Sequence, residues 1–182
     1  MIIRKATSYD PYILEGIARS VSVDRNTEKA SGLIELNLNR DSYEKRTHGN
    51  NFAFIAENGK RRSVGFMIGY HSDFLNRLTE MDEHAASDDI MRLLYDFPKP
   101  FLYCEQLAVL PDFSGRGIAT ALYDRTLKEM EKRSLKVLYA AVAHTPWKNK
   151  DSIDFIKKRD HVLVDEVTTM TGLVFGIYEK NL

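Results

Sequence analysis

The sequence predicts an α/β fold in which a mixed sheet carries helices on both faces. Three observations support this prediction. A strand, a loop with two glycines, a helix and another strand follow one another directly within residues 101–143. The strands expected before and after this unit come mostly as adjacent pairs, as in hairpins. The 182 residues are 43% hydrophobic and 10% aromatic, enough to bury the core of one domain spanning residues 1–182.

The N-terminal quarter is expected to contain one strand and two helical segments. Residues 2–6 form the opening strand. A helix follows with Asp10 at its N-cap and Pro11 in its first turn, where the missing N–H costs nothing. Its apolar residues have helical spacing and are Ile13, Leu14, Ile17, Ala18 and Val21. A second, broken helical stretch is expected between Thr27 and Arg46, with the apolar members Leu33, Leu36 and Leu38.

The rest of the chain is expected to alternate between strands and helices. Strands at residues 52–56 and 64–70 flank a turn containing Asn58-Gly59, which indicates a β-hairpin. The polar stretch Ser72–Lys99 is expected to hold one short helix at residues 90–95, ended by Pro98 and Pro100. The remaining elements are the strand 101–110, the loop 111–117, the helix 118–133, the strand 136–143, the helix 152–158 and the strands 162–167 and 173–178.

Charge, cysteine content and hydropathy argue against several functions. The 26 Lys and Arg balance 26 Asp and Glu, so a globally basic nucleic-acid-binding protein is not expected. The single cysteine, Cys104, excludes an internal disulfide framework and a multi-cysteine zinc site, and no other metal site is expected. The start lacks the apolar region of a signal peptide, and the longest apolar run, Val137–Ala143, is far shorter than a membrane span of roughly 20 residues. We therefore expect a soluble, cytoplasmic protein that binds neither nucleic acid nor a membrane.

The loop with two glycines is the most informative feature. The strand ending at Leu107-Ala108-Val109 leads through Gly115 and Gly117 directly into a helix. Free backbone N–H groups and the positive end of the helix dipole meet there, and this combination favours a pyrophosphate. Glycine lets phosphate oxygens approach the backbone closely, which a Cβ would prevent. The alternative is a tight strand-to-helix turn that binds nothing.

The loop could belong to one of three kinds of nucleotide-binding site. A Walker loop requires Gly-x-x-x-x-Gly-Lys-Ser/Thr, which the sequence lacks. A Rossmann dinucleotide site requires a third glycine, where Thr120 stands, and an acidic residue after the next strand, where Ala143-His144 stands. The third candidate is the pyrophosphate of coenzyme A (CoA).

The segment Tyr103–Leu122, YCEQLAVLPDFSGRGIATAL, resembles the GNAT superfamily of acyl-CoA-dependent N-acetyltransferases. In that family this strand, loop and helix carry a Gln/Arg-x-x-Gly-x-Gly/Ala signature. Gly117 and Ala119 match the signature, whereas Ser114 stands where Gln or Arg is usual.

Two other segments extend the resemblance over most of the chain. The opening residues 3–7 with Asp10 are similar to the family's first strand and helix start. Asn149, Ser152 and Phe155 match its Asn-x-x-Ala-x-x-Phe/Leu helix, which lies beside the coenzyme.

The resemblance implies a mostly antiparallel, twisted sheet and acetyl-CoA as co-substrate, without a metal. It implies an amine acceptor, either a small amine or a lysine or N-terminal amine, and leaves a homodimer open. The implied coenzyme-binding residues are Leu107, Ala108, Val109, Gly115, Arg116, Gly117, Ile118, Ala119, Thr120, Asn149 and Ser152. Arg116 is also, with Lys148 and Lys150, a candidate for binding the 3′-phosphate.

Three residues are candidates for catalysis. Glu105 lies on a largely apolar strand, and by resemblance this position often carries the general base; a structural ion pair is the alternative. His144 ends the neighbouring strand, where some similar enzymes have a base, although it could be a solvated loop histidine. The family's tyrosine, thought to protonate the leaving thiolate, is Ile156 here, so Tyr103 is the candidate proton donor, with simple packing as its alternative.

Strand alternation predicts the faces on which these side chains lie. Tyr103 and Glu105 are expected on one face together with Leu107 and Val109, and the other face is expected to carry Cys104, Gln106 and Ala108. Cys104 would then lie opposite Glu105 and has no adjacent histidine, which argues against a thiol nucleophile.

Two functions are compatible with this sequence. The first is an N-acetyltransferase in which a primary amine attacks the thioester directly. The second is a non-catalytic acyl-CoA sensor that keeps the fold, and Ile156 favours it. Residues 77–96 carry six acidic side chains against Arg77 and Arg92, which predicts a cationic acceptor; the alternative is a solvated acidic loop that does not contact the substrate. The six are Glu80, Asp82, Glu83, Asp88, Asp89 and Asp96.

Overall fold

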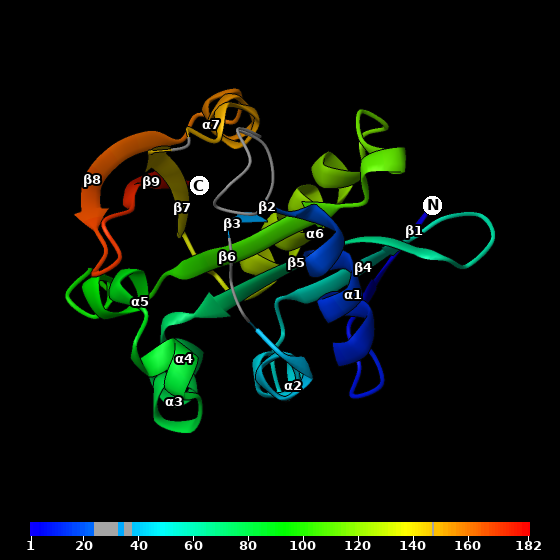
Figure 1. Ribbon diagram of the computed structural model, residues 1–182, viewed down its shortest axis with the longest axis horizontal. Helices are drawn as coiled ribbons and strands as arrows, with labels where there is room; N and C mark the ends of the chain where they lie inside the picture. Colours follow the sequence, from blue (N-terminus) through cyan, green and yellow to red (C-terminus); the bar gives the residue numbers. More distant parts are fainter. Residues whose placement is uncertain (24–32, 35–37, 147) are drawn as a thin grey trace.

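The computed structural model describes residues 1–23, 33–34, 38–146 and 148–182. Its centre is a seven-stranded sheet with the strand order β1-β4-β5-β6-β7-β9-β8 (Figure 1). The sheet strands are β1 (Ile2–Lys5), β4 (Ala53–Glu57), β5 (Ser63–His71), β6 (Leu102–Val109), β7 (Val137–Thr145), β8 (Val162–Thr168) and β9 (Val174–Asn181). Neighbours in this sheet are antiparallel except β6 and β7, which are parallel. The prediction of a mixed, mostly antiparallel sheet is therefore confirmed.

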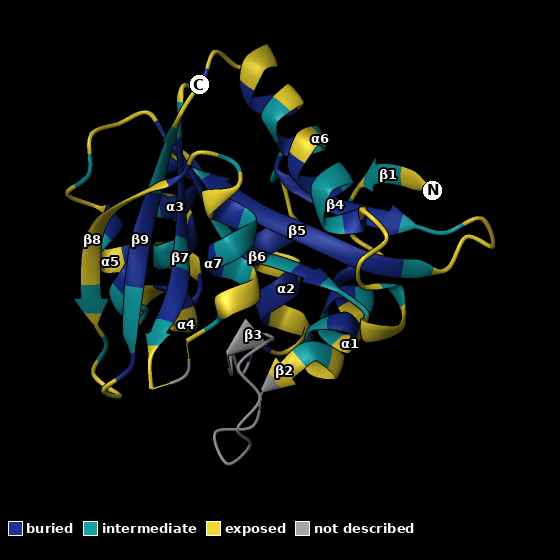
Figure 2. Ribbon diagram, turned by 90° about the horizontal axis from the view of Figure 1, so that it is seen from above, coloured by how far each residue is buried: buried dark blue, intermediate teal, exposed yellow. Residues whose placement is uncertain are grey.

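Helices cover both faces of the sheet, as predicted. The helices α1 (Pro11–Val21), α2 (Arg40–Thr47), α3 (Ser72–Met81), α4 (Glu83–Ala86) and α5 (Asp89–Leu94) lie on one face, and α6 (Ile118–Lys132) and α7 (Lys150–Lys157) lie on the other. Figure 2 shows the buried strand β5 between α6 on one side and α1 on the other. None of the helices that the structure describes is long and apolar enough to cross a membrane.

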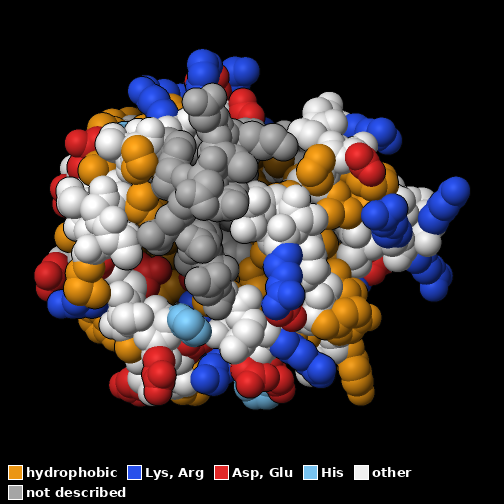
Figure 3. Space-filling model, viewed as in Figure 1, with side chains coloured by type: hydrophobic (Ala, Val, Ile, Leu, Met, Phe, Trp, Pro, Cys, Tyr) orange, Lys and Arg blue, Asp and Glu red, His pale blue; other side chains and the backbone are white. Residues whose placement is uncertain are grey.

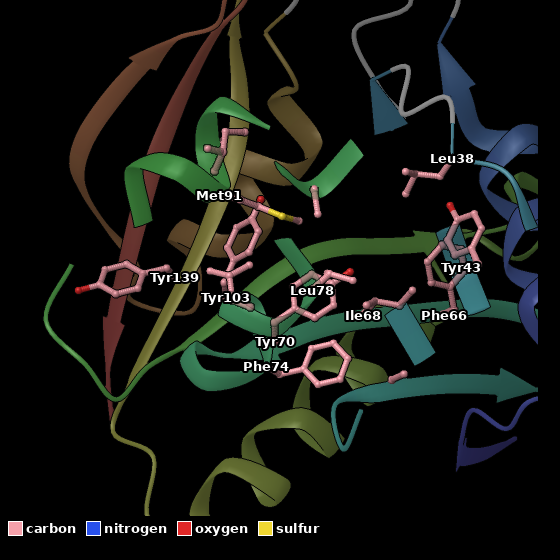
Figure 4. Packing of buried hydrophobic residues seen from close by; sticks show 14 of the residues in the cluster. Leu38, Tyr43, Phe66, Ile68, Tyr70, Phe74, Leu78, Met91, Tyr103 and Tyr139 are labelled. Atoms are coloured by element: carbon pink, nitrogen blue, oxygen red, sulfur yellow. The ribbon is translucent and has the colours of Figure 1, made fainter. Parts of the chain in front are cut away.

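The two faces of the sheet bury separate apolar clusters. On the α2 face, Phe66, Ile68 and Tyr70 of β5 pack with residues of α1–α5 (Figure 4). On the α6 face, Met67 of β5 packs with Leu122 and other residues of α6. Alternate residues of one strand thus enter opposite clusters, which explains why β5 is apolar over almost its whole length.

The prediction for residues 27–46 was wrong in part. The helix α2 begins at Arg40, because the side chain of Asn39 accepts a hydrogen bond from the N–H of Ser42 and so caps it. Leu33 lies in a strand instead: β3 (Leu33–Ile34) pairs in parallel with β2 (Ser22–Val23). Leu38 is buried just before α2, and Leu36 lies outside the described residues.

The stretch from Ser72 to Lys99 contains three helices where the sequence predicted one. Side chains at their N-caps, His71, Asp82 and Asp88, each accept a hydrogen bond from a backbone N–H in the first turn of α3, α4 and α5. Phe74 and Leu78 of α3 are buried at helical spacing. The polar residues that surround Phe74 and Leu78 in this stretch made the apolar pattern of α3 too weak to predict a helix.

Candidate active site

The parallel strands β6 and β7 part from each other in the middle of the sheet. Their register joins Leu102 to Leu138 and continues only as far as Cys104 and Ala140. Beyond these residues the two strands, both fully described, form no further pairs with each other. The edge of β6 that faces β7 therefore offers backbone N–H and C=O groups to a ligand.

A β-bulge in β6 changes which side chains face each cluster. Ile68 pairs with Gln106 and Gly69 pairs with Cys104, so Glu105 is an extra residue in β6. The side chains of Glu105 and Gln106 both bond to α2 residues, on the α2 face.

The predicted alternation along β6 is therefore wrong beyond Glu105. Leu107 and Val109 pack on the α6 face, whereas Ala108 packs on the α2 face together with Tyr103 and Glu105.

The glycine loop has a backbone conformation that favours glycine, and the space beside it is open. Gly115 and Gly117 have φ angles of +71° and +76°, which side-chain-bearing residues rarely adopt. A Cβ built on either glycine meets no atom within 4 Å, so the space beside the loop is open. Gly117 is the N-cap of α6 and supplies no side-chain cap, which leaves the first N–H groups of the helix for a ligand.

Arg159, which was not predicted from sequence as a site residue, links the first turn of α6 to the C-terminal end of α7. Its Nη2 donates to Oγ1 of Thr120 at 2.7 Å, and its guanidinium lies 3.6 Å from the ring centre of Phe155. The positive charge of the Arg159 guanidinium therefore lies beside the first turn of α6. Arg159 could have been found from the sequence, because it lies four residues after Phe155, the last residue that matches the family helix. Asn149 caps α7 by accepting from the N–H of Ser152 at 3.1 Å.

Glu105 lies in a buried network of charged and phenolic groups on the α2 face. The Nε of Arg46 lies 3.3 Å from both carboxylate oxygens of Glu105, and the Tyr70 hydroxyl donates to Oε2 at 2.5 Å. Nη1 of Arg46 also donates to Asp82. The side chains of Arg46 and Asp82 are each 1% exposed, and that of Glu105 is 2% exposed.

Electrostatics in this network favour the ionised forms of Arg46 and Asp82. Burial alone would lower the pKa of Arg46, but the charges of Glu105, Tyr70 and Asp82 raise it above its usual value. Burial alone would raise the pKa of Asp82, but Arg46 and the His84 N–H together lower it. Among the described residues, the ion pairs of Arg46 are those with Glu105 and Asp82.

The acidic stretch between β5 and β6 is less negative than its composition suggests. Asp82 is ion-paired with Arg46. Burial raises the pKa of Asp88 to about 6, with a smaller contribution from the charge of Glu105. Glu80, Glu83 and Asp96 are exposed, and Figure 3 shows acidic side chains gathered over α3–α5 at the lower left of this view.

His144 lies on the opposite face of the sheet from Glu105 and Tyr103. Its Nδ1 is 2.7 Å from Oε1 of Glu166, and its Nε2 is 2.9 Å from the hydroxyl of Tyr178. Tyr178 packs against α7, whereas Tyr103 lies in the α2-face cluster beside Tyr70 (Figure 4). The candidate groups thus form two separate sets, one on each face.

Tyr103 and Cys104 are both protonated at neutral pH. Burial, followed by the charges of Asp88 and Glu105, raises the pKa of Tyr103 well above its usual value. Burial and the charge of Glu105 raise the pKa of the Cys104 thiol to about 12. A thiol with this pKa is a poor nucleophile, in agreement with the sequence argument.

Comparisons with known proteins agree with this geometry. A family model described as "Acetyltransferase (GNAT) family" matches residues 24–160, well over half of the chain. No curated protein matches the sequence. Among solved structures, the chain is similar to Ard1 from Thermoplasma volcanium (14% identity, TM-score 0.66), with 100% of this chain and 97% of that chain covered.

Two further structures are similar over the whole chain. One is Arabidopsis thaliana Naa50 in complex with the bisubstrate analogue CoA-Ac-MVNAL (15% identity, TM-score 0.68, 100% and 98% covered). The other is the polyamine N-acetyltransferase of Drosophila melanogaster (10% identity, TM-score 0.67, 100% and 99% covered). At these identities the structures establish a common fold. Together with the match to the family model, they show that this chain belongs to the GNAT family of acetyltransferases.

Proposed function

We propose that this protein transfers the acetyl group of acetyl-CoA to a primary amine by direct attack of the amine on the thioester. The observation that carries the proposal is the parting of β6 and β7 directly before the glycine loop. This arrangement suits a long ligand whose pyrophosphate binds at the start of α6 and whose amide-containing arm pairs with the free edge of β6.

The proposed coenzyme contacts follow from this placement. The backbone of Leu107, Ala108 and Val109 would bind the arm, and residues 115–120 would bind the pyrophosphate. Arg159, with Arg116, would add positive charge near the phosphates. Backbone N–H groups near Val109 would stabilise the negative charge that develops on the thioester oxygen during attack. No covalent intermediate on the protein is required.

The test of this function is formation of an acetylated amine. Acetyl-CoA is incubated with the protein and a panel of small amines and short peptides, and the products are analysed by mass spectrometry. We expect at least one acceptor to gain the mass of one acetyl group in amounts that scale with protein concentration. A protein that binds CoA but acetylates no amine or peptide would instead be an acyl-CoA sensor, the alternative that Ile156 favours.

Glu105 is one proposed base, and its role can be separated from its ion pair. If Glu105 accepts the ammonium proton, Glu105→Gln should lower kcat by roughly 10²–10⁴-fold while leaving the affinity for CoA unchanged. Glu57→Gln is the matched control, because Glu57 is also a strand glutamate bonded to an arginine, Arg4, at 2.5 Å. Equal kcat values for the two variants would leave His144 and its partners as the base.

The acceptor is proposed to be cationic, such as a small polyamine or a lysine-containing peptide. The exposed acidic side chains over α3–α5 support this, and one neighbour by fold is a polyamine N-acetyltransferase. We expect kcat/KM for a cationic amine to exceed that for a matched neutral amine. The difference should shrink as salt shortens the screening length from about 30 Å at 0.01 M to about 3 Å at 1 M. Equal kcat/KM values for the two amines, unchanged by salt, would contradict the cationic acceptor but not the acetyl transfer itself.

A further inference from the structure

A hydrogen-bonded chain of three side chains runs from the surface of β8 into the protein. Glu166 on β8, whose side chain is 54% exposed, bonds to Nδ1 of His144 on β7. Nε2 of His144 bonds to the hydroxyl of Tyr178 on β9, a residue that is 2% exposed. An exposed carboxylate is thus connected to a buried phenol through one imidazole.

The packing fixes this chain in one orientation. The His144 ring lies over Gly176, where an added Cβ would come within 2.4 Å of Cε1. The two ring nitrogens of His144 are both hydrogen-bonded to protein side chains, Nδ1 to Glu166 and Nε2 to Tyr178. A carboxylate can only accept a hydrogen bond, so Nδ1 carries a proton and donates to Glu166. In neutral His144, Nε2 accepts the hydrogen bond from Tyr178.

The buried end of the chain lies close to the point where β6 and β7 part. Tyr178 packs with Val142, Ile153 and Ile156. Val142 lies two residues beyond Ala140, the last residue of β7 that pairs with β6. Tyr178 thus packs in the same buried cluster as Ile156, a side chain that cannot donate a proton, and it belongs to the sheet rather than to α7.

The surroundings keep the phenol protonated. Burial, followed by the negative charge of Glu166, raises the pKa of Tyr178 above its usual value. The titratable groups His144 from β7 and Glu166 from β8 face Tyr178, and α7 contributes the apolar side chains of Ile153 and Ile156. Tyr178 therefore has a proton to give at neutral pH, and its hydroxyl is hydrogen-bonded to Nε2 of His144.

We propose that Tyr178 is the catalytic residue that carries the proton from the attacking nitrogen to the departing sulfur, with His144 and Glu166 as its positioning residues. The inference rests on the proposed acetyl transfer. As the C–N bond forms, the nitrogen gives a proton to the Tyr178 oxygen, and the Tyr178 proton moves to Nε2 of His144. The imidazolium is stabilised by Glu166. As the C–S bond breaks, the same two steps reverse and the sulfur receives the proton, so no net proton is gained or lost.

This assignment differs from the one predicted by sequence. Tyr103, the candidate proton donor, lies in the apolar cluster on the α2 face beside Tyr70 and Met91 (Figure 4). His144 cannot reach a substrate through a free nitrogen, because Glu166 and Tyr178 occupy both. Tyr178 is the group through which His144 would act.

The test compares Tyr178→Phe with Tyr139→Phe. Tyr139 is the control, since it is likewise a buried sheet tyrosine whose hydroxyl has a side-chain partner, in its case the carboxylate of Glu179 at 2.8 Å. Tyr178→Phe should lower kcat by about 10²-fold with KM for acetyl-CoA unchanged, as expected for loss of a proton-transfer group. Tyr139→Phe should leave both values near those of the wild type. Equal kcat values for the two variants would overturn the proposal.

A second measurement distinguishes proton transfer from packing. A fluorinated tyrosine, whose phenol ionises at lower pH, is incorporated at position 178 or at position 139. At position 178 it should move the alkaline limb of the pH–kcat profile to lower pH, and at position 139 it should not. Identical profiles would overturn the role of Tyr178 while leaving acetyl transfer intact. A wild-type chain that binds CoA without acetylating any amine would instead overturn the proposed function, and this inference with it.

Discussion

Replacing Arg46 with methionine is expected to lower the free energy of unfolding by about 3–5 kcal/mol. The change removes the positive charge and leaves Glu105 and Asp82 as buried carboxylates, both at most 2% exposed, without their ion-pair partner. Arg19→Met is the matched control, because Arg19 is 75% exposed and its pair with Glu15 should contribute less than about 1 kcal/mol. Denaturation with urea measures both values. A loss below about 1 kcal/mol for Arg46→Met would contradict this account of the network.

The effect of Arg46→Met should also depend on pH. Because the folded-state pKa of Asp82 is lowered, its contribution to stability is present above the usual aspartate pKa and is lost as pH falls through the folded value. Arg46→Met removes the main attraction that offsets burial of this carboxylate. The difference in stability between wild type and variant should therefore be largest near neutral pH and shrink in acid.

Gly117→Glu is expected to weaken CoA binding by at least about 100-fold, which is roughly 3 kcal/mol. The glutamate would place its side chain in the open space beside the loop and its negative charge next to the phosphates. It would also remove the glycine at a φ angle of +76°. Titration calorimetry with CoA measures the loss.

Gly49→Glu separates the binding effect from backbone strain. Gly49 has a φ angle of +70°, and a Cβ there also meets no atom within 4 Å. The two variants should therefore carry similar strain, but only Gly117→Glu should lose CoA affinity. Wild-type affinity in Gly117→Glu would show that the phosphates bind elsewhere.

The glycine loop and α6 could be predicted because their signals are local. Gly115 and Gly117 stand directly before the amphipathic helix, and the structure gives both the positive φ that only glycine adopts easily. The faces of β6 could not be predicted beyond Glu105. The bulge there depends on how β6 pairs with β5, and a strand's own alternation carries no information on its pairing.

The partners of the charged residues could not be predicted from the local sequence either. Arg46 meets Glu105 only because α2 packs on β6, and His144 meets Tyr178 only because β7 and β9 are neighbours. A structural ion pair for Glu105 was one of the two interpretations that its place on an apolar strand allowed. Only the tertiary structure shows that Arg46 is the cation of this ion pair and that Asp82 shares Arg46 with Glu105.

The most direct test of the proposed acetyl transfer is to follow CoA thiol release and the intact mass of the protein in one sample, with and without an accepted amine. Direct transfer predicts that the thiol appears only when the amine is present, in an amount equal to the amide formed, and that the protein never carries an acetyl group. An acetylated protein, or an absence of thiol release with every amine tested, would contradict the account.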